Sequence, residues 1–225
     1  AGILLLLLLA TPLLPSINLA NRAERKPLSQ VFKIYADPSA LRLAAAVGAP
    51  LTVALGLITI TPDYLIHVLK VAPATIGVIS TVGILSSVVA GLFAGFILNL
   101  RVIGPISVVA GALIGVTLEV LVFIPGVSVD VAIAAKVAQG FFSSFVGGWV
   151  FTSIPKMTRN GDVMGGGGIA EQALYISMFL GPVLLYPLFA LPTRVPFFVA
   201  LIVSSLLPLF LLPLGFKRNE SSPLV

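Results

Sequence analysis

The sequence contains no cysteine and only one histidine, His67, among its 225 residues. A chain without cysteine has no disulfide, no thiolate nucleophile and no cysteine-ligated metal. Its eight acidic residues form no cluster, and no nucleophile and base occur in a catalytic arrangement. We therefore expect a protein that is not an enzyme and that binds no metal or other cofactor.

Charged residues of both signs are also scarce. They make up 9% of the chain, against roughly 25% of an average soluble protein. Apolar residues make up 58%, and the mean hydropathy is +1.14. The apolar runs are continuous rather than alternating with polar residues, which favours membrane helices over the strands of a barrel. The composition predicts an all-α integral membrane protein whose first partner is the lipid bilayer.

Seven apolar runs are long enough, or nearly so, to cross a bilayer, which takes about 20 helical residues. The first, residues 1–20, is interrupted by Pro12 and Pro15. The polar, basic segment that follows it, residues 21–41, is interpreted as a connecting loop, with a helix on the membrane surface as the alternative. A flexible turn rich in glycine is expected at residues 156–168. The other six spans are predicted at residues 43–60, 72–98, 102–124, 130–154, 168–191 and 195–214.

The basic residues indicate how these spans are oriented. When the spans alternate, ten of the thirteen basic residues fall on one side of the membrane, and the positive-inside rule makes that side cytoplasmic. The linker at 21–41 and the tail at 217–225 are thus predicted to be cytoplasmic. Because the basic residues are spread between spans rather than gathered on one face, no nucleic-acid partner is expected. The ten residues are Arg22, Arg25, Lys26, Lys33, Arg42, Arg101, Lys156, Arg159, Lys217 and Arg218.

Two motifs in the later spans are similar to motifs of one transporter family. Lys136-x-x-Gln139-Gly140 lies in the span at 130–154, and it resembles the basic-x-x-Gln-Gly pattern of the major facilitator superfamily. Gly181-Pro182 lies in the next span and resembles the family's glycine-proline motif. Proline and glycine at such positions soften a membrane helix and allow close packing.

A third motif, Gly95-x-x-x-Asn99-x-Arg101, resembles the family's cytoplasmic loop motif, in which an Asp stands at the position of Asn99. The order of the three motifs resembles the C-terminal half of such a transporter. The resemblance implies that residues 1–20 are the last helix of a preceding bundle. It also implies that residues 42–216 form a six-helix bundle of 3+3 inverted repeats. Since the sequence starts without Met or a charged leader, we expect further spans before it.

The resemblance implies a secondary active transporter, or half of one, that moves a small-molecule solute by alternating access. Coupling to protons is an open possibility. The expected partner is a missing N-terminal half, a second copy of the chain or other membrane subunits. The alternative function is a non-transporting membrane subunit that assembles or scaffolds a larger complex. A retinal protein fits less well, because the span at 195–214 has no lysine for a Schiff base.

Ionisable and amide residues inside the spans are candidates for substrate or coupling contacts. Lys136, one turn from Gln139, either extends its ammonium to the interface or faces a central cavity, where it would bind an anionic group or respond to a coupled proton. Glu119 is either a proton carrier or a hydrogen-bonding partner of a neighbouring helix or another subunit, since the resemblance places its helix at the bundle periphery. Gln172 and Tyr175 share one helix face, which either lines a polar path or bonds to a neighbouring helix.

Overall fold

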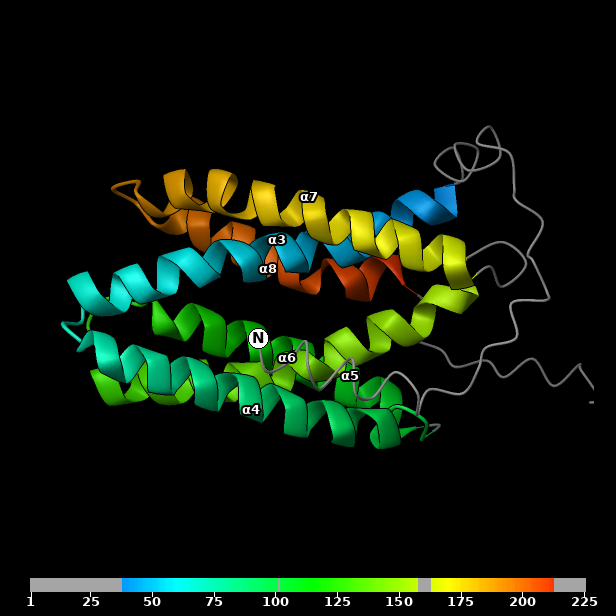
Figure 1. Ribbon diagram of the computed structural model, residues 1–225, viewed down its shortest axis with the longest axis horizontal. Helices are drawn as coiled ribbons and strands as arrows, with labels where there is room; N and C mark the ends of the chain where they lie inside the picture. The colour runs from blue at the N-terminus through cyan, green and yellow to red at the C-terminus, as the bar shows by residue number, and fades with distance from the viewer. Residues whose placement is uncertain (1–37, 101, 158–162, 213–225) are drawn as a thin grey trace, which may run out of the picture. The chain divides into compact units, whose positions relative to one another are not determined.

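The computed structural model describes residues 38–100, 102–157 and 163–212. In this part of the chain all regular structure is helical, with six helices and no strand (Figure 1). Five of them are long and apolar enough to cross a membrane, and the last is a shorter apolar helix. The protein is therefore a multi-pass integral membrane protein, as the composition predicts. The helices are α3 (Pro38–His67), α4 (Pro73–Ile97), α5 (Ile103–Val122), α6 (Val129–Met157), α7 (Val163–Phe189) and α8 (Val195–Leu211).

Several predictions fall wholly or partly outside the described residues. These are the membrane helix at 1–20, most of the linker at 21–41, the tail at 217–225, and Arg101 of the loop motif.

At two places a proline or a run of glycines does not interrupt a helix where the sequence predicts an interruption. α3 continues through Pro62 to His67, beyond the predicted end at residue 60. α7 begins at Val163, so the glycines at 165–168, predicted to form a flexible turn, are helical. In lipid, a backbone group outside a helix finds no water as a hydrogen-bond partner, so the chain keeps its helical bonds even at residues that disfavour a helix in water.

The six helices form two groups of three (Figure 1). In the first group, α3 packs chiefly against α7 and also against α8; in the second, α6 packs chiefly against α5 and α4. The groups meet where α5 contacts α8 and, less extensively, where α3 contacts α6. The polar interior described below lies at this junction.

Helices α3 and α7 approach each other through glycine. A Cβ atom added at Gly56 would lie 2.7 Å from the carbonyl oxygen of Gly181, so only hydrogen atoms fit between the two backbones. Near this contact, the Ser177 hydroxyl donates to the carbonyl of Gly48 at 2.9 Å and accepts from the Thr52 hydroxyl at 3.1 Å. Small residues that admit such approach drive helix association in membranes, where the hydrophobic effect does not. Gly181 of the glycine-proline motif is thus a packing residue.

Helices α4 and α6 repeat this arrangement. A Cβ atom at Gly140 would lie 2.9 Å from the carbonyl oxygen of Gly83. One turn later, the Ser144 hydroxyl donates to the carbonyl of Ser87 at 3.1 Å. In both helix pairs, residues later in one helix contact residues later in the other, so each pair is parallel.

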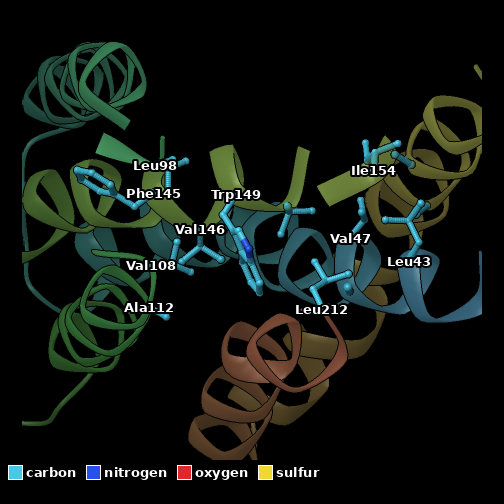
Figure 2. Close-up of a cluster of buried hydrophobic side chains, with 14 of the residues drawn as sticks. Leu43, Val47, Leu98, Val108, Ala112, Phe145, Val146, Trp149, Ile154 and Leu212 are labelled. Carbon is cyan, nitrogen blue, oxygen red and sulfur yellow. The ribbon is translucent and has the colours of Figure 1, made fainter. Parts of the chain in front are cut away.

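The apolar core spans both groups of helices. Trp149 of α6, the only tryptophan in the sequence, is 1% exposed and belongs to a buried cluster formed by residues of both groups. Figure 2 shows Leu98 and Phe145 on one side of its indole ring, and Val47 and Leu212 on the other. The fluorescence of this single buried tryptophan therefore reports on the junction between the two groups.

Aromatic rings and one arginine close one end of the bundle. The guanidinium carbon of Arg194 lies 5.2 Å from the ring centre of Tyr64 and 4.8 Å from that of Phe189. Its Nη1 also donates to the carbonyl of Phe123 at 3.2 Å. Such a cation over aromatic faces adds electrostatic attraction to packing. Arg194 therefore links the end of α3 to the ends of α5 and α7.

Several hydroxyl groups are bonded within their own helix. Each donates to a carbonyl three or four residues earlier, which is the usual way that Ser and Thr are accommodated in a helix. The O–H donor of each hydroxyl is thus already bonded within its own helix, and it does not need a partner on another helix. They belong to Thr59, Thr81, Ser87, Ser107, Thr117, Thr152 and Ser153.

Candidate functional site

A chain of polar side chains crosses the interior at the junction of α5, α6 and α8. The Lys136 ammonium donates to Oε1 of Gln139 at 3.3 Å, and Nε2 of Gln139 faces Oε1 of Glu119 at 3.4 Å and Oγ of Ser143 at 3.1 Å. On the other side, the Ser205 hydroxyl donates to Oε2 of Glu119 at 3.2 Å. Three residues predicted separately from the sequence, Glu119, Lys136 and Gln139, are thus joined in one network.

Helix geometry explains how α5 brings its carboxylate to this network. Gly111, Gly115 and Glu119 recur every four residues, so they lie on one face of α5. At Gly111 an added Cβ atom would lie 2.9 Å from the carbonyl oxygen of Phe142, so α5 and α6 are in backbone contact there. That contact turns Glu119 inward, where its side chain is 6% exposed. Although its helix was expected at the bundle periphery, Glu119 makes its contacts inside the bundle.

Gln139 connects the two opposite charges. Its amide oxygen accepts from the ammonium of Lys136, and its amide nitrogen donates toward the carboxylate of Glu119. A neutral amide is suited to this position because it both donates and accepts hydrogen bonds. A buried lysine and a buried carboxylate are therefore coupled through one side chain.

Residues of the network line two cavities. The first, here called the α5 cavity, has a volume of about 200 Å³, and Glu119 and Ser205 are among its lining residues. The second, here called the α4 cavity, has a volume of about 360 Å³, lies among α3, α4 and α6, and is lined in part by Lys136. Gln139 lines both. A change in its side chain would therefore alter both cavities at once.

One residue that lines the α4 cavity carries a polar group without a partner. Thr61 of α3 lines this cavity and is 4% exposed. Its Oγ1 makes no hydrogen bond to any of the residues that the structure describes. A buried hydroxyl without a partner is unfavourable by roughly 1–3 kcal/mol. Because the oxygen itself is fully buried, it is not exposed to a ligand in the cavity.

The other predicted site residues lie apart from this network. Gln172 and Tyr175 of α7 are exposed, and the Tyr175 hydroxyl donates to Oε1 of Glu171 at 3.3 Å. Neither Gln172 nor Tyr175 lines the two cavities. In the loop motif, Nδ2 of Asn99 donates to the carbonyl of Gly95 at 2.7 Å. Asn99 thus satisfies a backbone carbonyl at the end of α4.

Two members of the site are not singled out by the sequence. Ser205 follows another serine, Ser204, in an apolar helix, and only the packing of α8 against α5 selects which of the two meets Glu119. Thr61 resembles any other hydroxyl residue of its span until α3 and α4 are placed together. The signal that does exist in the sequence is the spacing of Lys136, Gln139 and Ser143, which puts the three on one face of α6.

Comparison of the chain with protein-family models, with curated proteins and with solved structures found no match. The function is therefore argued from the site itself, because a helical fold is compatible with many functions.

Proposed function

We propose that the chain forms a six-helix bundle of a secondary active transporter of the major facilitator type, which moves a small solute by alternating access. One observation carries the proposal: a lysine and a carboxylate inside a membrane bundle are joined by an amide that lines two cavities. Ionisable residues in the membrane are energetically expensive and mark ion and substrate pathways. The Glu119–Gln139–Lys136 network is the proposed solute and coupling site.

The packing of the helices supports the 3+3 repeat that the proposal requires. In a 3+3 repeat, α3, α4 and α5 correspond to α6, α7 and α8 in that order. The contact between α3 and α7 then corresponds to the contact between α6 and α4. The contact between α5 and α6 corresponds to the contact between α8 and α3. All of these pairs are in contact, and the remaining interhelical contacts also map onto each other. The glycine contacts follow the same rule, because Gly56 with Gly181 corresponds to Gly140 with Gly83. Transporters built from inverted repeats bind solute near the interface of the repeats.

Alternating access by this mechanism needs two bundles. The second is supplied by the rest of a longer polypeptide or by a second copy of the chain, and a surface is available for it. α4 exposes large apolar side chains, among them Ile84, Leu92, Phe93 and Phe96. An exposed apolar surface of this kind faces either lipid or a neighbouring bundle.

The inward position of Glu119 counts against the alternative of a non-transporting subunit. That alternative gains support from a carboxylate on the bundle surface, available to a partner protein. Instead, Glu119 is 6% exposed and bonded to Gln139 and Ser205 within the same bundle.

Solute-induced currents of the full chain in proteoliposomes on a solid-supported membrane test the proposal, with a panel of anionic, cationic and neutral solutes. At least one solute should give saturable currents. Gln139→Leu, which removes the link between the two charges, should reduce them by about tenfold or more, as expected for bonds to charged groups. Thr117→Val is the matched control, because Thr117 is exposed on α5 and bonded within its own helix.

The result that overturns the proposal is equally specific. If no solute gives a current, and the native mass of the assembly shows the chain held among unrelated membrane proteins, the scaffolding alternative stands instead. If currents occur but Gln139→Leu and Lys136→Met both leave them unchanged, the network is not the transport site.

A further inference from the structure

We propose that the α4 cavity binds a singly charged organic carboxylate with a compact apolar body. Because it names the solute class, this inference rests on the function proposed above, although the site can be tested by binding alone. The cavity combines one lysine side chain with largely apolar walls. These two features select different parts of the ligand.

The cation selects a negative charge. The Lys136 ammonium carries three donors, and its hydrogen-bonding partner among the described residues is the neutral oxygen of Gln139 at 3.3 Å. The two remaining donors, on a residue that lines the cavity, are available to a ligand. A carboxylate there would form a charge-assisted hydrogen bond, which is about twice as strong as a neutral one.

The walls select an apolar body. Around Lys136 and Thr61 the cavity is lined chiefly by aliphatic side chains, which are Leu57, Ile58, Leu65, Ile76, Ile79 and Ile84. Such walls are unfavourable for a ligand with several hydroxyl groups, because each would lose its water without gaining a partner. A volume of about 360 Å³ suits a compact aromatic or short aliphatic acid. Benzoate is therefore a suitable probe.

The experiment is equilibrium binding of radiolabelled benzoate to the full chain in lipid nanodiscs. Saturable binding is expected, with benzamide, the neutral analogue, competing at least about tenfold more weakly. Lys136→Met keeps the apolar stem but removes the charge, and it should weaken benzoate binding about 10- to 100-fold.

Two matched variants control for nonspecific effects. Lys70→Met removes a lysine that is exposed and lies between α3 and α4, and Thr59→Val changes a threonine on α3 that is bonded to the carbonyl of Gly56. Both should bind benzoate like the wild-type chain. Native Trp149 fluorescence in each variant shows that it is folded. If Lys136→Met fails to fold, the difference between benzoate and benzamide decides the question.

Equal binding of benzoate and benzamide, or full binding of benzoate by a folded Lys136→Met, would overturn the site. Binding of hexadecanoate without any binding of benzoate would overturn it as well, because the occupant would then be a lipid rather than a compact acid. The transport proposal can fail separately. Benzoate binding without any transport current would support the binding site and refute the transport proposal. Currents with another class of solute, without benzoate binding, would support transport and refute the carboxylate site.

Discussion

The close contact between α3 and α7 gives a sharp test of the fold. In Gly56→Ala the new methyl group would lie 2.7 Å from the carbonyl oxygen of Gly181 and 2.6 Å from Cδ1 of Leu185. The two backbones would have to separate by roughly 0.7 Å to reach an ordinary distance of 3.4 Å, and a gap of that size forfeits a quarter to a half of each dispersion contact along the pair. Overpacking of this kind costs about 1–3 kcal/mol.

Gly91→Ala provides the matched control, because Gly91 is exposed on α4 and a methyl group there would meet nothing within 4 Å. Both substitutions gain the same helix propensity, about 1 kcal/mol, so the difference between them isolates the contact. Unfolding in SDS, followed by Trp149 fluorescence, should show Gly56→Ala to be less stable than Gly91→Ala by about 1–3 kcal/mol. Equal stability of the two variants would refute the backbone contact. So would full rescue of Gly56→Ala by Leu185→Ala, which relieves only the side-chain clash.

Three further predictions use the same chain. Because the protein lacks cysteine, a single introduced cysteine is a specific site for labelling. Lys70→Cys should react with an impermeant maleimide from outside intact cells, and Asn99→Cys should react only after permeabilisation. The reverse pattern would contradict the predicted orientation. Arg194→Ala should lower stability in the SDS assay by about 1–3 kcal/mol through loss of its ring contacts and carbonyl bond; an unchanged midpoint would show that these contacts contribute nothing. Without ligand, Thr61→Val should be more stable than wild type by about 1 kcal/mol, because a buried hydroxyl without a partner is replaced by a methyl group. The control Thr59→Val should change the stability little. A destabilised Thr61→Val would mean that the hydroxyl has a hydrogen-bond partner.

The sequence predicts the helices well because lipid leaves the backbone few alternatives, but it predicts their ends poorly. In soluble proteins a proline such as Pro62 predicts the end of a helix, yet α3 continues through it. For the site, the proximity of Lys136 and Gln139 follows from their spacing of three residues on one helix. The inward direction of Glu119 depends on how α5 packs against α6, and the contribution of Ser205 depends on how α8 packs against α5. Both contacts depend on tertiary packing, which local sequence patterns do not predict.

The hydroxyl groups bonded within their own helices have a consequence for motion. A bond from Thr117 to the carbonyl of Leu113, or from Thr81 to that of Gly77, has both ends on one helix, so it travels with that helix and neither resists nor guides sliding against a neighbour. Hydroxyl bonds between helices, such as that of Ser177 to Gly48 and that of Ser205 to Glu119, instead resist relative motion, because they must break when the two helices slide. The number of serines and threonines in a membrane helix therefore says little about how firmly it is held, and a few positions set its mechanical coupling.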